Sequence, residues 1–299
     1  MSFRIVVLAK QVPDTRNVGK DAMKEDGTIN RAVLPAIFNP DDLNALEMAL
    51  EVKSKMPNAT VHVITMGPTR ATDIIREAMY RGADGGFLLS DAKFAGSDTL
   101  ATSYALSKAV EKLNPNLIFC GLQAIDGDTA QVGPQIAEKL HFAQVTYAEE
   151  ILNVDRQNMT IKRRLEHGFE IVKAKLPLLV TVHSSAKVCR SRKANDWSSD
   201  VCSSDLLKYK YAKAKTEMQS VANQYQKLYE TRPYLHIEEW NAESINANIG
   251  QLGLNGSPTK VKKVDNIVLT QKDSKVLSAC DNDIEQMMVE LIDSKVIGG

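Results

Sequence analysis

The stretch from Cys120 to Pro134 reads Cys-Gly-Leu-Gln-Ala-Ile-Asp-Gly-Asp-Thr-Ala-Gln-Val-Gly-Pro and decides the fold of the chain. The apolar run at 117–120 predicts a short buried strand that ends at Gly121. Gly127 gives the backbone freedom in the polar loop that follows, and Thr129 is the expected N-cap of a helix. The pattern therefore predicts a strand, a glycine-bearing loop and a helix.

A unit of this kind gathers unpaired backbone amides at the start of the helix, where the helix dipole also favours negative charge. The loop is therefore a candidate phosphate site, and an ordinary strand-to-helix connection is the alternative. It is not a Walker loop, because no Gly-Lys-Ser/Thr follows it. It is not the dinucleotide fingerprint either, since Gly127 and Gly133 have the wrong spacing.

Strand and helix patterns alternate four times before residue 140. Apolar segments of strand length occur at 3–9, 60–66, 86–89 and 117–120. Each is followed by a helical pattern, and the expected helix starts are Asn39, Thr69 or Thr72, 97–99 and Thr129. The alternation predicts an α/β fold with a mostly parallel, doubly wound sheet and right-handed crossovers.

The first of these helices has the clearest start. Asn39 is expected to cap it, with Pro40 at the first helical position and Asp41 and Asp42 in the first turn. The polar loop at 10–15 follows the first strand, and ligands of open α/β sheets bind at the carboxyl ends of strands. We therefore expect this loop to form a wall of the site, with a solvated turn as the alternative.

The character of the sequence changes after residue 140. Segments at 145–152, 159–165 and 169–174 predict an antiparallel excursion, which returns through an apolar strand at 178–182. A helical pattern at 281–297 predicts an amphipathic arm at the carboxyl end. We expect an α/β nucleotide-binding domain over 1–190 and a carboxy-terminal extension with a partner-binding arm over 207–299.

Residues 191–206 separate these two regions. Within them, 195–206 (Asn-Asp-Trp-Ser-Ser-Asp-Val-Cys-Ser-Ser-Asp-Leu) has neither helical nor strand periodicity and repeats Ser-Ser-Asp. The stretch resembles a translated sequencing adapter, and a natural serine-rich loop is the alternative.

Composition excludes several classes of protein. The 299 residues carry 37 lysines and arginines and 37 acidic residues, and this balance argues against nucleic acid as a main partner. The four cysteines form no Cys-x-x-Cys pair, which argues against zinc and iron–sulfur sites. The amino terminus enters a strand pattern directly and no apolar run is long enough to span a bilayer, so we expect a cytoplasmic protein without membrane insertion.

Further segments accompany the central stretch. They are 7–15 (Val-Leu-Ala-Lys-Gln-Val-Pro-Asp-Thr), Asn39-Pro40, 63–68 (Val-Ile-Thr-Met-Gly-Pro), 97–103 (Ser-Asp-Thr-Leu-Ala-Thr-Ser) and 256–259 (Gly-Ser-Pro-Thr). In this order and at these spacings they resemble the beta subunits of electron transfer flavoproteins. The sequence at 124–134 resembles the branch of the family that holds a second FAD and bifurcates electrons; it reads Ala-Ile-Asp-Gly-Asp-Thr-Ala-Gln-Val-Gly-Pro.

The resemblance implies an adenine-nucleotide alpha-hydrolase-like fold and a set of cofactor-binding residues. These are Ala9, Asn39, Met66, Thr99, Thr102, Gly121, Gln123, Asp126, Gly127, Asp128, Thr129, Ala130, Gln131, Val132 and Gly133. Turn capping is the alternative role for each of them. Because a carboxylate aimed at a phosphate would repel it, we expect Asp126 and Asp128 to face ribose hydroxyls, backbone donors or solvent.

The resemblance also implies FAD as the cofactor, with AMP as the alternative. Members that keep AMP carry bulkier or acidic residues where this chain has Gly127, and glycine permits a closer approach to a pyrophosphate. One departure is Leu122, at a position that is often basic in the relatives. A cation missing there would alter the flavin potential or the contact with NADH, so this departure bears on bifurcation more than on FAD binding.

The function implied is electron transfer within a heterodimer with an alpha subunit. NADH would donate electrons, which would pass to ferredoxin or flavodoxin and, through the FAD of the alpha subunit, to an acyl-CoA dehydrogenase. An AMP-containing shuttle with one FAD and a nucleotide-binding module without a redox role are the alternatives. We find no catalytic triad, nucleophile elbow or set of metal-spaced histidines, as is typical of a protein whose chemistry belongs to its flavin.

Overall fold

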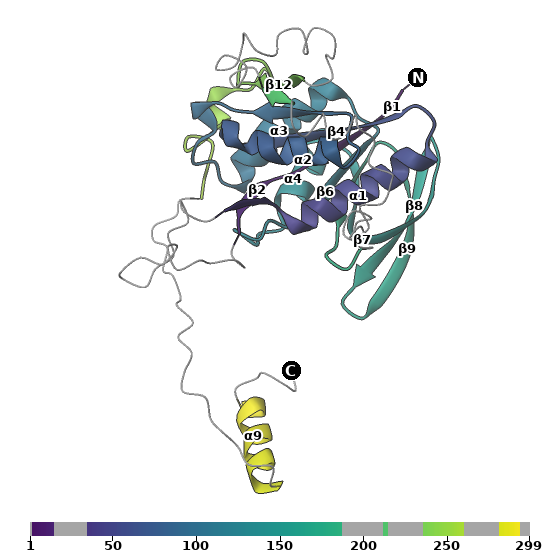
Figure 1. Cartoon of the computed structure of the whole chain (residues 1–299), viewed down its shortest axis with the longest axis vertical. Helices are drawn as coiled ribbons and strands as arrows, with labels where there is room; N and C mark the ends of the chain where they lie inside the picture. Colours follow the sequence, from purple (N-terminus) through teal and green to yellow (C-terminus); the bar gives the residue numbers. More distant parts are fainter. Residues whose placement is uncertain (1, 15–34, 187–211, 215–235, 260–280, 294–299) are drawn as a thin grey trace.

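A ten-stranded sheet lies at the centre of the computed structural model, which describes residues 2–14, 35–186, 212–214, 236–259 and 281–293 (Figure 1). The strands are β1 (Phe3–Leu8), β4 (Ala59–Met66), β5 (Gly85–Leu89), β6 (Leu117–Gly121), β7 (Ala143–Val154), β8 (Asn158–Leu165), β9 (Gly168–Lys175), β10 (Leu178–Val182), β11 (Lys213–Ala214) and β12 (His236–Trp240). Their order is β11-β12-β5-β4-β1-β6-β10-β7-β8-β9.

All neighbouring strands pair in parallel except β7 with β8 and β8 with β9, which are antiparallel. Helices α1 (Pro40–Lys55), α2 (Thr72–Tyr80), α3 (Thr99–Leu113) and α4 (Val132–Leu140) alternate with the first strands along the chain. The mostly parallel α/β sheet and the antiparallel excursion after residue 140 are therefore confirmed.

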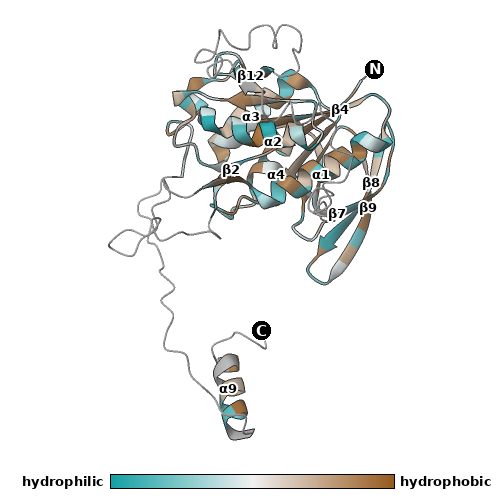
Figure 2. Cartoon of the chain, in the orientation of Figure 1, coloured by the Kyte–Doolittle hydropathy of each residue, from teal (hydrophilic) through white to brown (hydrophobic). Residues whose placement is uncertain are grey.

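Two layers of helices cover the sheet, because its central strands are apolar on both faces. Side chains of α1 such as Leu46 and Val52 pack against Ile5 and Val63 on one face. Side chains of α3 and α4 pack on the other face. There Ile136 belongs to a cluster with Val6 and Ile118, which alternate along their strands with the residues of the first cluster. Figure 2 shows the apolar positions concentrated in the central strands. Complete burial of each large aliphatic side chain stabilises the fold by roughly 1.5–3 kcal/mol.

Two of the expected helix starts are confirmed: α1 begins at Pro40 after Asn39, and α3 begins at Thr99. Asp98 caps α3 and accepts hydrogen bonds from the amides of Leu100 and Ala101. The helix ends at Asn114, which adopts a left-handed conformation before Pro115. The expected cap at Thr69 or Thr72 is wrong, because Thr69–Ala71 forms a short 3-10 helix (η2) and α2 begins at Thr72 without a side-chain cap.

Two features of the structure were not predicted from the pattern. Strand β12 pairs in parallel with β5, so residues 236–240 extend the sheet beyond the expected final strand, β10. Part of the expected polar loop at 10–15 forms β2 (Gln11–Pro13), which pairs with β3 (Ala36–Phe38) in a separate antiparallel sheet. Two further 3-10 helices, η3 (Ala92–Phe94) and η5 (Ile249–Gln251), lie in connections.

The carboxy-terminal helix forms as α9 (Asp281–Asp293), and residues 294–297 of the expected helix lie outside the described residues. The apolar side chains whose burial is described on this helix are exposed, namely Ile284, Met287, Met288, Val289 and Ile292. The anomalous stretch at 195–206 lies outside the described residues. Among the described helices, none combines the length and apolar composition needed to cross a membrane.

Candidate functional site

The loop after β6 starts at Gly121, which lies against the first turn of α1. The amide of Gly121 donates a hydrogen bond of 2.9 Å to Oδ1 of Asp42. A Cβ atom at Gly121 would lie 2.6 Å from atoms of Asp41 and Asp42. Only glycine therefore allows the end of β6 to approach the start of α1 this closely.

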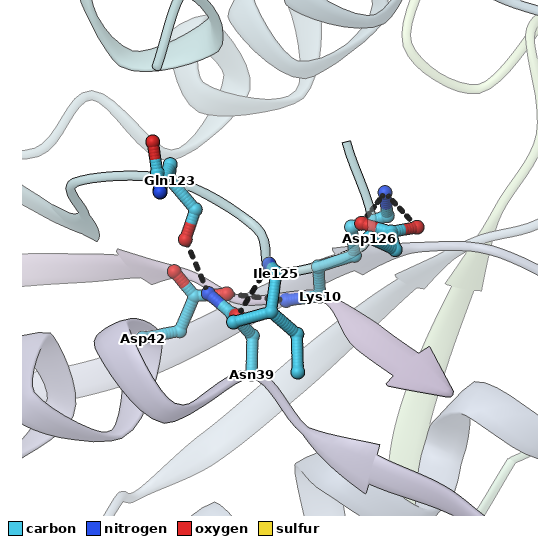
Figure 3. A network of polar contacts seen from close by, with 6 residues as sticks. All are labelled: Lys10, Asn39, Asp42, Gln123, Ile125 and Asp126. Atoms are coloured by element: carbon cyan, nitrogen blue, oxygen red, sulfur yellow. Dashed lines mark hydrogen bonds and ion pairs between the residues drawn. The ribbon is translucent and has the colours of Figure 1, made fainter. Parts of the chain in front are cut away.

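Asp42 joins the carboxyl ends of two neighbouring strands. Its carboxylate is buried, and its second oxygen accepts a hydrogen bond of 2.9 Å from the amide of Lys10, two residues beyond β1 (Figure 3). Burial raises the pKa of Asp42 to about 7, although the hydrogen bonds from Lys10 and Gly121 act in the opposite direction. Burial also raises the pKa of Asp41, against a hydrogen bond from the backbone of Gln123.

Asn39 holds the middle of the loop. Its Nδ2 donates to the carbonyl of Gln123 at 2.8 Å, and its Oδ1 accepts from the amide of Ile125 at 3.2 Å (Figure 3). Asn39 stands at the N-cap position of α1 as expected, but the prediction that its side chain caps the helix is wrong. A side-chain amide has both a donor and an acceptor, so a fully buried asparagine can satisfy a carbonyl and an N–H of the loop together.

Asp126 is held by a side chain from the segment that follows β1. Lys10 Nζ lies 2.8 Å from Oδ1 and 2.7 Å from Oδ2 of Asp126 (Figure 3). In this structure Asp126 thus pairs with a lysine ammonium, and the expectation that it faces ribose hydroxyls, backbone donors or solvent stays a prediction. Asp128 is exposed and accepts a hydrogen bond of 3.0 Å from Nε2 of Gln123.

The loop reverses direction before α4. The carbonyl of Ala124 accepts hydrogen bonds from the amides of Gly127 and Asp128, and two later residues, Asp128 and Ala130, have φ angles of 47° and 52°. These left-handed residues interrupt a right-handed helix. The predicted N-cap at Thr129 is therefore wrong: Thr129 is an exposed loop residue, and α4 begins at Val132 with Gln131 at the N-cap position.

The residues between the turn and α4 meet the requirements of a phosphate cradle. Among the described residues, the amides of Thr129, Ala130 and Gln131 have no hydrogen-bond acceptor. A backbone that alternates into left-handed conformations turns successive amides toward one anion. No atom lies within 4 Å of the position that a Cβ at Gly127 would take, so the space beside that residue is open. The local structure therefore fits a phosphate group.

Val132 and Gly133, by contrast, pack against the sheet. A Cβ at Gly133 would lie 2.8 Å from Sγ of Cys120 and 3.0 Å from the methyl group of Thr181. Val132 packs against the same apolar cluster as Cys120. Burial raises the pKa of the Cys120 thiol, which keeps it protonated. Glycine at 133 thus lets α4 approach β6 and β10.

Ala9 and Met66 lie at the carboxyl ends of adjacent strands. Ala9 follows β1 directly and donates its amide to the carbonyl of Ile64 at 3.0 Å, while Met66 is the last residue of β4. Beside Met66, the hydroxyl of Thr65 is buried and has no hydrogen-bond partner among the described residues. The hydroxyl is closed to solvent, so it offers no open contact for a ligand in this structure.

Of the two threonines on α3, one reaches the loop. The hydroxyl of Thr99 donates to Oε1 of Gln131 at 2.8 Å and so connects the start of α3 with the start of α4. Thr102 lies in the next turn of α3, and in the described part of the chain its side chain makes no hydrogen bond to the loop.

Asp42 and the side chain of Lys10 were not predicted as site residues. Asp42 was assigned to the helix dipole, because its position in the first turn is sufficient reason for an acidic residue. Its contacts with Lys10 and Gly121 join residues 32 and 79 positions away, so no local pattern contains them.

Comparison with known proteins gives the family. A family model described as the electron transfer flavoprotein domain matches residues 26–196. The electron transfer flavoprotein subunit beta of Thermoanaerobacterium thermosaccharolyticum is 38% identical over 293 residues, which cover 98% of this chain and 99% of that protein. The caffeyl-CoA reductase-Etf complex subunit CarD of Acetobacterium woodii is 39% identical, with 87% of this chain and 86% of that protein covered.

A third relative is similar over a shorter span. The acryloyl-CoA reductase electron transfer subunit gamma of Anaerotignum propionicum is 50% identical over 182 residues, which cover 60% of this chain and 67% of that protein. The matched segment at 26–196 contains the whole loop after β6 together with β10. The chain therefore belongs to the family of electron transfer flavoprotein beta subunits.

Proposed function

We propose that this chain binds FAD at the loop after β6 and transfers electrons as the beta subunit of a bifurcating electron transfer flavoprotein. The observation that carries the proposal is that the amides at 129–131 have no acceptor in the described part of the chain, together with the open space at Gly127. A diphosphate needs several backbone donors and a close approach to the backbone, and these two features support such a site.

The residues of the chain would bind and orient the cofactor. The amides of Thr129, Ala130 and Gln131 would hold the phosphates, and Ala9 and Met66 would lie beside the adenosine. Asn39 and Asp42 would not touch the redox centre, but they hold the loop in place through Gln123, Ile125 and Gly121. Bound FAD would supply the redox chemistry by taking a hydride from NADH and releasing its electrons singly.

The partners follow from the family and the names of relatives. Beta subunits of this family assemble with alpha subunits, and two relatives carry the names of an acryloyl-CoA reductase and a caffeyl-CoA reductase complex. We infer an acyl-CoA dehydrogenase or related CoA-dependent reductase as one electron acceptor. Ferredoxin or flavodoxin would be the other acceptor, and the cytoplasm would be the site of action.

Counting the cofactors of the purified heterodimer tests the proposal. The full chain is co-expressed with its alpha subunit, and the released nucleotides are separated and quantified. Two FAD molecules per heterodimer are expected. One FAD and one AMP would refute the bifurcating function while keeping the family, and a colourless complex with bound AMP or ATP would indicate a nucleotide-binding module without a redox role.

A further inference from the structure

Lys10 combines a fixed backbone with a side chain that can move. Its amide donates to Oδ2 of Asp42 at 2.9 Å, and its carbonyl accepts a hydrogen bond of 3.0 Å from the amide of Asn39. The side chain is half exposed. Lysine carries its ammonium on four flexible methylene groups, so the charge can change partners while the main chain stays in place.

The present partner of that ammonium belongs to the candidate phosphate loop. Lys10 Nζ contacts both carboxylate oxygens of Asp126, which directly precedes Gly127 (Figure 3). The exposed fractions of the two side chains are 50% and 24%. Ion pairs with this degree of exposure contribute little to stability, because water and salt screen them. The contact is therefore easily exchanged for a better anion.

Apart from Lys10, the charged side chains described around the loop are acidic. Asp126 and Asp128 lie within the loop, and Asp41 and Asp42 lie beneath its start. Among the described residues, the hydrogen bonds and ion pairs made by side chains with 121–131 include one cationic group, the ammonium of Lys10. Without Lys10, the charged side chains that contact or belong to this loop in the described part of the chain would all be acidic.

We propose that Lys10 is a phosphate-binding residue with a built-in competitor. In the absence of a coenzyme its ammonium pairs with Asp126. When an adenine coenzyme binds, the ammonium turns to the phosphate groups, and Asp126 lowers the affinity because it competes for the same charge. The inference rests on the proposed function, since it places those phosphates at 127–131.

Calorimetric titration of the full chain, stripped of bound nucleotide, tests this exchange with ADP and adenosine as probes. Lys10→Met should weaken ADP binding about 10-fold or more, as expected for the loss of a charge-assisted hydrogen bond, and leave adenosine binding unchanged. Lys10→Arg should restore most of the affinity for ADP. Asp126→Asn should strengthen ADP binding about 3-fold or more, because the competitor is removed.

A matched control is available on α1. Lys55 forms a similarly exposed ion pair with Glu51 at 2.7 Å, near the other end of the helix from the loop. Lys55→Met should leave both affinities unchanged. If Lys10→Met leaves ADP binding unchanged or weakens adenosine equally, Lys10 does not bind phosphate and the proposal is wrong.

Two other outcomes are equally informative. If Asp126→Asn weakens ADP binding, the carboxylate helps to form the site instead of competing with the ligand, and the proposal is again overturned. If the wild-type chain binds neither ADP nor FAD, the proposed function itself fails. The second result differs from the first because it appears before any substitution is made.

Discussion

Asp42 and Gly121, 79 residues apart in the sequence, are joined by a hydrogen bond of 2.9 Å between a carboxylate oxygen and an amide. The other oxygen of Asp42 accepts the amide of Lys10. One buried side chain at the start of α1 therefore connects the ends of β1 and β6, where the candidate phosphate loop begins. The two contacts hold the loop close to the strand ends before any ligand arrives.

The raised pKa of Asp42 predicts a pH dependence of stability. Burial raises this pKa from 3.8 to about 7, so the folded state binds the proton more tightly than the unfolded state. The contribution is fully favourable below about pH 4 and is lost as the pH rises to about 7, by up to about 4 kcal/mol. Urea unfolding between pH 4 and pH 8 measures it.

Asp42→Asn should reduce this decline in the free energy of unfolding. Asp73→Asn, which removes an exposed carboxylate on α2, controls for the loss of a surface charge. A decline between pH 4 and pH 7 that is as steep in Asp42→Asn as in the wild-type chain would show that another group is responsible.

Asn39→Ala should loosen the loop. The substitution leaves the carbonyl of Gln123 and the amide of Ile125 without their partners in a partly buried environment. The free energy of unfolding should fall by about 2 kcal/mol, and FAD binding should weaken. Asn44→Ala, on the helix that follows Asn39, is the matched control, because the side chain of Asn44 makes a long hydrogen bond of 3.4 Å to Ser184 and no other within the described residues. Equal losses in the two variants would argue against this role.

Gly133→Ala should destabilise the fold through packing. The added methyl group would meet Sγ of Cys120 at 2.8 Å, so α4 must move away from the sheet at a cost of about 1–3 kcal/mol. Thermal unfolding measures the loss, and Cys120→Ala in the same chain should recover part of it, since the two residues are in contact. Additive effects of the two substitutions would contradict this explanation.

Gly127→Ala should leave stability nearly unchanged and weaken FAD binding. Nothing lies within 4 Å of the new methyl group, so the free energy of unfolding should change by less than about 0.5 kcal/mol. The methyl group would nevertheless take up part of the open space at residue 127, and FAD content after purification should fall. Unchanged FAD content would mean that the diphosphate does not approach this residue.

Asp98→Ala should affect two segments together. Asp98 caps α3, and its other oxygen accepts a hydrogen bond of 3.1 Å from the amide of Thr259. The free energy of unfolding should fall by about 1–2 kcal/mol, and hydrogen exchange at the Thr259 amide should accelerate. Asp98→Asn keeps one acceptor oxygen and places an N–H donor at the other position, so it should restore most of the helix cap but not the hydrogen bond from Thr259. Unchanged exchange at Thr259 in Asp98→Ala would rule out the tether.

The order of strands and helices could be predicted because it depends on local periodicity. Apolar runs such as 3–9 and 60–66 are buried on both faces wherever the sheet places them, so they form strands in nearly the expected positions. Strand β12 was not predicted, since His236–Trp240 contains three polar residues and no apolar run, and it becomes recognisable only through its pairing with β5.

The loop after β6 was predicted as a site, but its geometry was not. The predicted N-cap of α4, Thr129, lies two residues before the observed one, Gln131, because Thr129 is a good capping residue and the left-handed conformations of Asp128 and Ala130 cannot be read from their identities. The role of Asn39 was assigned to the nearest backbone groups, whereas its actual partners lie 84 and 86 residues away.

The sequence by itself determined the α/β alternation, the family and the position of the candidate loop, since each is encoded in contiguous residues. Tertiary structure alone decided that Lys10 pairs with Asp126, that Asp42 joins two strand ends and that the amides at 129–131 find no acceptor in the described parts of the chain. These contacts depend on parallel strands bringing distant segments to one edge of the sheet. No periodicity within a single segment records them.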